Sequence, residues 1–166
     1  MKTFLKNYTS DVPVSQTIYR IEQVLLRCGV RGIMKEYGID QSITAITFKI
    51  EVDGKPVAIR LPVKEDQATG ILWKEYAGDD YDNKKDTIVE HRAGQKRKRR
   101  GDFAEQGART AWKIVQDWVE VQMSMIQTGQ AELMEVFLPY VFDGKRTYFT
   151  AIKESKFAGL LKDSKE

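Results

Sequence analysis

The residues of this sequence that most clearly could do chemistry form one unbroken basic run. It consists of Lys96, Arg97, Lys98, Arg99 and Arg100. The chain has a formal net charge of +3, so the remainder carries −2 without these five charges. Because the field of the whole chain is weak, we expect any attraction to a polyanion to be local to this run.

Aromatic residues and further cations precede the basic run. Cations release counterions when they neutralise phosphates, and aromatic rings stack on the bases of single strands. The pattern therefore predicts a surface for single-stranded or structured nucleic acid. Besides the run, its predicted members are Trp73, Tyr76, Lys84, Lys85 and Arg92, with Lys49 and Arg60 on the polar face of a predicted sheet. The alternative interpretation is a charged, solubilising linker, because eight acidic residues lie between positions 65 and 101.

Metal, cofactor and catalytic sites are not indicated. His91 is the only histidine, whereas zinc sites need clustered ligands. The acidic cluster 79–82 lacks the glycine and the distal glutamate of a calcium-binding loop. The stretch 29–32 fits neither a phosphate-binding loop nor a dinucleotide fingerprint. Val57–Leu61 lacks the carboxylate that restriction-type nucleases carry on the corresponding strand. We therefore expect a protein without enzymatic activity, metal or cofactor.

Length and composition favour one domain over residues 1–166 with a proper core. No apolar run approaches the roughly 18–20 residues that cross a bilayer. The first residues lack the apolar stretch of a secretory signal. Cys28 is the only cysteine, and we interpret it as a small buried apolar residue. These features together predict a cytoplasmic protein that does not associate with membranes.

The strongest structural signal is a hairpin around Asp53-Gly54. Apolar residues alternate on both sides of this dipeptide, which favours a type I′ turn because both central residues then need positive φ. A two-residue turn fixes the register. The predicted pairs are Val52 with Lys55, Ile50 with Val57, Phe48 with Ile59, Ile46 with Leu61, Thr47 with Arg60 and Lys49 with Ala58. Together with a strand over 31–37, this hairpin predicts a three-stranded antiparallel meander.

Two helices should accompany the meander. Helical spacing predicts the first over Gln16–Cys28, with Ser15 as N-cap and Gly29 at its end. The second should be a long helix, packed on the sheet, from an N-cap at Asp102 to about Gln127. Its expected buried stripe consists of Ala104, Ala108, Ala111, Val115, Trp118 and Met125, widened by Trp112, Val119 and Ile126. We expect at least one of the two tryptophans in the core, and the other could anchor a partner or a second copy through the 103–127 helix.

Two regions are less regular. Residues 65–101 predict a flexible charged insertion, with at most a short helical turn at Trp73 and Tyr76. A short helix should run from Ala131 to about Leu138, before Pro139. After it, Asp143-Gly144 could turn a second hairpin, or Thr147 could cap a last helix, which we favour. The predicted fold class is α+β, with an N-terminal helix, the meander, the long helix and short C-terminal helices.

Two stretches resemble small bacteriophage and prophage proteins of uncharacterised function. They are 9–22, beginning Thr9-Ser10-Asp11-Val12-Pro13, and 109–140, beginning Arg109-Thr110-Ala111-Trp112 and ending Phe137-Leu138-Pro139-Tyr140. The resemblance covers about half of the chain. It implies a viral or mobile-element setting, in which accessory proteins act in DNA replication and recombination or against host defences, and it supplies no catalytic residues.

These observations favour a nucleic-acid-binding accessory protein that uses a basic arm on an α+β platform. The alternative is a protein-binding inhibitor or adaptor, for example an anti-host factor, that acts through the apolar surface of the long helix. The sequence does not distinguish DNA from RNA, and it gives neither sequence specificity nor oligomeric state.

Overall fold

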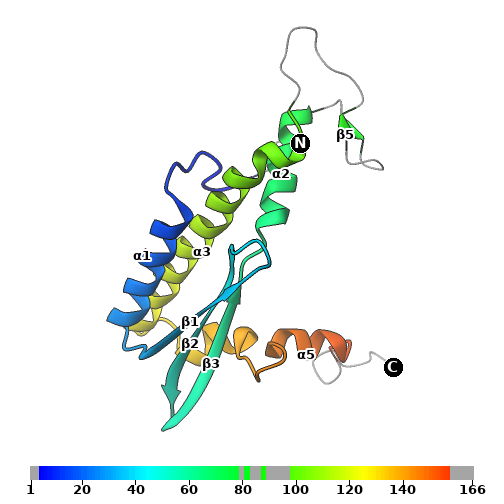
Figure 1. Ribbon diagram of the computed structural model, residues 1–166. Coiled ribbons are helices and arrows are strands. Elements are labelled where there is room, and N and C mark those ends of the chain that lie inside the picture. Colours follow the sequence, from blue (N-terminus) through cyan, green and yellow to red (C-terminus); the bar gives the residue numbers. More distant parts are fainter. Residues whose placement is uncertain (1–3, 79–80, 83–86, 89–97, 158–166) are drawn as a thin grey trace. The chain divides into compact units, whose positions relative to one another are not determined.

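The computed structural model describes residues 4–78, 81–82, 87–88 and 98–157, and these form an α+β fold (Figure 1). In chain order the elements are α1 (Val14–Arg27), β1 (Gly32–Tyr37), β2 (Ile43–Val52), β3 (Lys55–Pro62), α2 (Glu65–Ala77), β4 (Tyr81–Asp82), β5 (Thr87–Ile88), η2 (Arg100–Phe103), α3 (Ala104–Gln127), α4 (Leu133–Phe137), η3 (Leu138–Tyr140) and α5 (Tyr148–Glu154). The N-terminal helix, the meander, the long helix and the short C-terminal helices are as predicted.

The chain divides into two compact units. The first unit comprises residues 1–21 and 63–118, and the second comprises residues 22–62 and 119–166. The meander, α4 and α5 belong to the second unit, whereas α2 and η2 belong to the first. The single domain expected from length remains a prediction.

The predicted hairpin is confirmed residue by residue. The strands β2 and β3 pair antiparallel, with Val52 opposite Lys55, Phe48 opposite Ile59 and Thr47 opposite Arg60. Asp53 has φ 50° and Gly54 has φ 73°, the positive values that the expected turn needs. Since β1 pairs with β2, the sheet order is β1-β2-β3.

The core of the second unit lies on the apolar face of this sheet. Phe48 and Ile59 are fully buried there. The ring of Phe137, from α4, meets that of Phe48 edge-on at 5.6 Å and 88°. At the end of α1, Gly29 has φ 87°, and Val30 N–H donates to Leu25 C=O at 3.1 Å. This Schellman motif confirms the predicted helix end.

The C-terminal segment combines the two alternatives that the sequence left open. Thr147 caps α5, because its Oγ1 accepts the N–H of Thr150 at 3.3 Å. Thr147 also pairs with Phe142 in an isolated antiparallel bridge, so residues 143–146 form the turn of a very short hairpin. Phe142 N–H donates to Ala58 C=O at 2.8 Å, so this segment pairs briefly with β3. The favoured helix is confirmed.

Two predicted helix starts are wrong. The helix α1 begins at Val14, and Pro13 C=O already accepts the N–H groups of Gln16 and Thr17 at 3.1 Å, so Ser15 lies inside the helix. Asp102 is not the N-cap of α3, which begins at Ala104. Asp102 instead lies in η2 and accepts the backbone N–H of Arg99 at 2.8 Å. The helix α1 thus begins earlier than its cap signal indicated, whereas α3 begins later, after the short helix η2.

The buried face of α3 includes Ala111, Trp112 and Val119 as predicted, but it is rotated from the rest of the predicted stripe. It is centred on Trp112, Gln116, Val119 and Met123, each at most 3% exposed. Val115, Trp118 and Met125 are only half-buried, and Ala104 is exposed. The prediction counted apolar residues alone, whereas the core row of α3 includes the polar Gln116. Trp112 confirms that one tryptophan is in the core. In Figure 1, α1 and α3 lie side by side.

The N-terminal segment of the first unit is fastened to α3. Asp117 receives Lys6 Nζ at 2.8 Å and Asn7 Nδ2 at 3.0 Å. One turn earlier on the same helix, Lys113 Nζ lies 3.0 Å from Asp117. Burial tends to raise the pKa of Asp117, but the hydrogen bonds from Lys6, Asn7 and Lys113 outweigh it and lower this pKa to about 2.

The expected insertion is wrong over its first third. Residues 65–77, predicted to hold at most one helical turn, form the 13-residue helix α2. Trp73 and Leu72 are buried on it. At Gly107 of α3, an added Cβ would lie 2.1 Å from Thr69 Oγ1 and 2.8 Å from Thr69 Cα, so the two helices approach closely there. Trp112 Nε1 also donates to Glu65 Oε1 at 2.6 Å. Packing against α3, rather than an apolar stripe of its own, therefore orders α2.

Candidate nucleic-acid interface

The C-terminal half of α2 and the short helix η2 bring three aromatic rings together. Trp73 and Tyr76 stack at 6.1 Å between centroids and 22° between planes, as residues one turn apart on a helix can. Phe103, at the end of η2, lies 5.3 Å from Tyr76 and 6.0 Å from Trp73. We call Trp73, Tyr76 and Phe103 the aromatic cluster. It lies entirely within the first unit.

Of the three rings, Trp73 is 4% exposed and Tyr76 is 38% exposed. Trp73 was predicted to contact nucleic acid directly, but a ring with so little accessible surface cannot offer a face to a base. Its position makes it the support on which Tyr76 rests. Tyr76, also predicted, keeps accessible surface and is the ring that a ligand can reach.

Lys98 is the cation of the basic run that the structure places directly on the aromatic cluster. Its Nζ lies 5.6 Å from the ring centroid of Tyr76 and 5.4 Å from that of Phe103. Both distances are within the range of a cation–π interaction. Among the described residues, no acidic side chain forms an ion pair with Lys98. Among the described residues, the groups recorded around this ammonium are the ring faces of Tyr76 and Phe103.

The next two cations of the run differ from each other. Arg99 is exposed, and its backbone N–H, not its guanidinium, is the group bound to Asp102. Arg100 is turned back onto α2, where its Nη2 lies 2.9 Å from both carboxylate oxygens of Asp66. This pair is solvent-accessible, with Asp66 83% exposed, so it is a weak ion pair. Nevertheless, the charge of Arg100 is matched locally, and Lys98 and Arg99 remain the stronger candidates.

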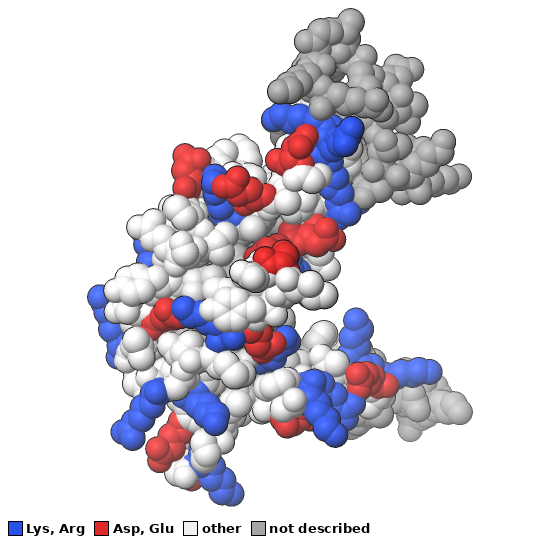
Figure 2. Space-filling model, viewed as in Figure 1, with Lys and Arg blue, Asp and Glu red and all other residues white. Residues whose placement is uncertain are grey.

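Figure 2 shows the consequence for the surface: at the end of the first unit that carries α2 and η2, Lys and Arg side chains border on Asp and Glu side chains. Acidic groups interleave with the basic ones, as the composition of residues 65–101 indicated. Attraction at this surface must come from particular side chains rather than from a uniformly basic face.

The two predicted cations of the sheet belong to the second unit. Arg60 is held in a fork with Glu36, because Nε and Nη2 donate to Oε1 and Oε2 at 2.7 Å each. Thr47 Oγ1 adds a third donor to Glu36 at 3.1 Å. The hydrogen bond from Arg60 lowers the pKa of Glu36, and the same bond raises the pKa of Arg60. The guanidinium also lies 5.6 Å from the ring centroid of Phe142.

This arrangement identifies Arg60 as a clamp across the three strands, since Glu36, Thr47 and Arg60 come from β1, β2 and β3 respectively. A guanidinium whose fork is already occupied by a carboxylate has little left for a phosphate. Lys49, in contrast, is exposed and makes no ion pair with a described residue. Its predicted contact with nucleic acid stays a prediction.

Five predicted contact residues lie outside the residues that the structure describes. They are Lys84, Lys85, Arg92, Lys96 and Arg97. His91 and residues 79–80 of the acidic cluster also lie outside the described residues. Phe103, on the other hand, is a cluster member that sequence reasoning missed. A signal existed, because it is the first aromatic residue after the basic run and directly precedes α3.

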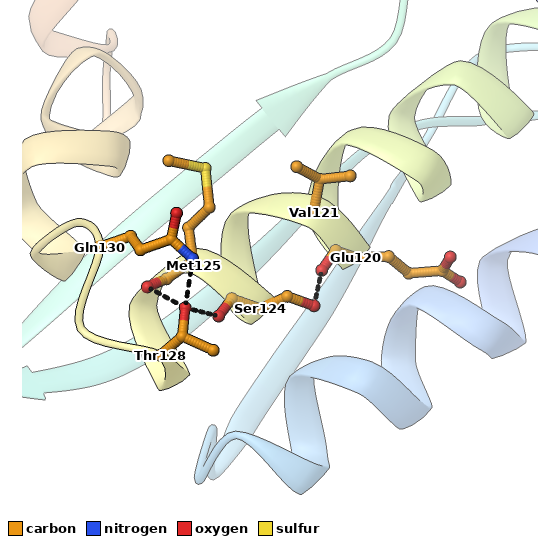
Figure 3. A pocket seen from close by; sticks show the side chains of 6 residues that line it. All are labelled: Glu120, Val121, Ser124, Met125, Thr128 and Gln130. Atoms are coloured by element: carbon orange, nitrogen blue, oxygen red, sulfur yellow. Dashed lines mark hydrogen bonds between the residues drawn. The ribbon is translucent and has the colours of Figure 1, made fainter.

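A depression in the second unit has no comparable chemistry. It has a volume of about 290 Å³ and lies at the C-terminal end of α3, where Val121, Met125 and Gln130 are among its lining residues (Figure 3). The hydroxyls of Ser124 and Thr128 donate to backbone carbonyls of α3, at 2.7 and 2.8 Å. These two hydroxyls thus bind the backbone at the end of the helix.

Over the described part of the chain, no group of three or more His, Cys, Asp or Glu side chains could hold a metal ion. The same part contains no helix that is long and apolar enough to span a bilayer. Cys28 is half-buried, and burial raises the pKa of its thiol, which disfavours the reactive thiolate. Gln127 Nε2 lies 3.5 Å from its sulfur.

Comparisons with known proteins add no further constraint. No family model, no curated protein and no solved structure matches this chain.

Proposed function

We propose that this protein binds nucleic acid, without catalysing a reaction on it, through the surface formed by the end of α2 and η2. The observation that carries the proposal is the position of Lys98 and Arg99. They are two cations of a run of five and make no ion pair with a described acid, and Lys98 lies beside the accessible ring of Tyr76. Cations that are free to pair with phosphates, next to an accessible ring, are the two components of strand-binding surfaces.

The surroundings of this surface support the same role. The helix α2 is anchored by the buried Trp73 and by the close approach of Thr69 to Gly107, so the surface has a fixed base. The basic run continues beyond the described residues as Lys96 and Arg97. A phage or prophage setting for such an accessory protein remains a prediction from resemblance.

The test is binding of fluorescently labelled DNA and RNA, single- and double-stranded, at two salt concentrations. A variant with Lys96, Arg97, Lys98 and Arg99 replaced by alanine should bind at least about tenfold more weakly and with a smaller salt dependence. Arg100 is left in place because it pairs with Asp66. Unchanged affinity together with an unchanged salt slope would remove the basis of the proposal.

A protein-binding role is the second candidate. The observation that favours it is Val121, which is 54% exposed beside Met125 in the depression at the end of α3. Apolar side chains around a depression can seat a partner's side chain. Val121→Asp should abolish capture of such a partner and leave nucleic-acid affinity unchanged, whereas the alanine variant of the basic run should do the reverse. Pull-down with and without nuclease treatment separates the two roles.

A further inference from the structure

We propose that the ligand of this surface is a single strand, and that one of its bases stacks on Tyr76 and Phe103 in the place now taken by Lys98. The inference rests on the proposed nucleic-acid binding and names the class of ligand. It begins from an unusual local arrangement: two ring faces, from α2 and η2, converge on one ammonium group at 5.6 and 5.4 Å.

The rings are prepared for stacking before any ligand arrives. Tyr76 stacks on Trp73, which is 4% exposed, and Phe103 is tilted by 47° against Tyr76. A ring that is held by neighbours loses little conformational freedom when it binds, which favours affinity. Tyr76 nevertheless keeps 38% of its surface accessible, so the support does not close it off.

Lys98 marks where the base would lie. An ammonium group at an exposed site gains little from a ring face, and stacking of a base on the same ring gains more. A base can therefore displace the lysine. The released ammonium stays close on its flexible stem, where it can pair with a phosphate of the same strand. The exposed Arg99 is the adjacent residue and provides a second phosphate contact.

A duplex does not meet these requirements. Its bases are stacked on one another, so a base would first have to be unstacked and unpaired before it reached Tyr76. A strand whose bases are unpaired presents them without this cost. The ring arrangement therefore favours single strands, although the cations alone would attract both forms.

The experiment compares three probes on the full chain: an oligothymidylate of about 12 nucleotides, an abasic strand with the same phosphates, and a duplex. Tyr76→Leu removes the ring and keeps an apolar side chain. It should lower affinity for oligothymidylate about tenfold and leave affinity for the abasic strand unchanged. Tyr76→Phe, the matched control, should bind both as the unaltered protein does.

Lys98→Gln gives an independent signature. It removes a phosphate contact from every probe but also uncovers the rings for a base. Its loss of affinity should therefore be larger for the abasic strand than for oligothymidylate. Circular dichroism shows whether Tyr76→Leu keeps its helices. If it does not, the difference between the two strands in Lys98→Gln still decides the question.

Three results would overturn the inference in different ways. Equal affinity of the unaltered protein for oligothymidylate and for the abasic strand would exclude stacking and leave the proposed function standing. Equal loss for both strands in Lys98→Gln would show that Lys98 does not occupy a base position. Absence of salt-dependent binding to any of the probes would instead remove the proposed function itself.

Discussion

Two cations of this protein lie over aromatic rings at similar distances, but their electrostatic partners differ. Arg60 on the meander lies 5.6 Å from the ring centroid of Phe142, and Lys98 lies 5.6 Å from that of Tyr76. Arg60 also donates two hydrogen bonds to Glu36. Among the described acids, none pairs with Lys98. The electrostatic partner, rather than the nearest ring, therefore distinguishes Arg60, which joins the strands, from Lys98, which we propose serves a ligand.

The two regions also differ in what holds them in place. The meander is fixed by its own strand pairing and by a turn that the sequence encodes locally. The surface that carries Lys98 depends on α2, which is ordered by contacts with α3. Disturbing these contacts should therefore remove the proposed binding surface while the meander persists.

The largest effect is expected for Gly107→Ala. The new methyl group would meet Thr69 at 2.8 Å from both its backbone N and Cα, so α2 must shift away from α3. We expect a loss of about 2–3 kcal/mol in the free energy of unfolding, although alanine is the better helix former. Urea denaturation measures this loss, and nucleic-acid affinity should fall with it.

Gly101→Ala is the matched control, because an added Cβ at Gly101 meets nothing within 4 Å. It should change stability by less than about 0.5 kcal/mol. If Gly107→Ala were as stable as this control, the close packing of α2 on α3 would be refuted.

A smaller loss is expected when the N-terminal segment of the first unit is released. The pKa of Asp117 is about 2 in the folded protein, below the roughly 3.9 of a free aspartate. Because the folded-state pKa is the lower one, the carboxylate stabilises the fold above about pH 4, and this contribution is lost as pH falls towards 2. Asp117→Asn should therefore cost about 2 kcal/mol at pH 7 and nearly nothing at pH 2.

Denaturation of both proteins across this pH range checks the prediction. A cost that is independent of pH would show that the carboxylate charge is not what holds Lys6 and Asn7. Lys6→Met should reproduce only part of the effect, because Lys6 is 61% exposed and two other donors remain.

The smallest effect on stability concerns the clamp on the meander. Glu36→Gln removes the negative charge with which Arg60 pairs and keeps the size of the side chain. Since both side chains are partly exposed, at 29% and 26%, we expect a loss of about 1 kcal/mol. The substitution also leaves Arg60 without the carboxylate of Glu36, and Lys98 likewise pairs with none of the described acids.

Glu36→Gln therefore tests the comparison directly. If binding belongs to the surface of α2 and η2, freeing Arg60 should leave the affinity for a labelled single strand within about twofold of the original. A clear gain in affinity would place a binding surface on the meander, where Lys49 and Arg60 were predicted to contribute.

How far the sequence predicts this molecule depends on how local each signal is. The hairpin register follows from Asp53-Gly54 and the alternation around it, so it is correct pair by pair. The helix α2 is not predicted, because its sequence has no continuous apolar stripe and its order comes from Thr69, Glu65 and their contacts on α3. The same reason explains the rotated face of α3, where a polar residue, Gln116, occupies the core row.

The candidate site follows the same rule. Charge and aromatic content identified Tyr76 and Lys98 from sequence alone, since both are properties of single residues. The sequence did not show that Trp73 is buried, or that Arg60 and Arg100 each form an ion pair with an acidic residue. Each depends on a residue that is distant along the chain or on an element that was not predicted.

The most direct test of the account is the salt dependence of single-strand binding in two charge-matched double variants. Lys98→Ala with Arg99→Ala removes two cations from the surface of α2 and η2, and Lys55→Ala with Lys145→Ala removes two exposed cations from the second unit. The account predicts that the first variant lowers the slope of log affinity against log salt by about 1–2, and that the second leaves it unchanged. Equal slopes in the two variants would contradict it.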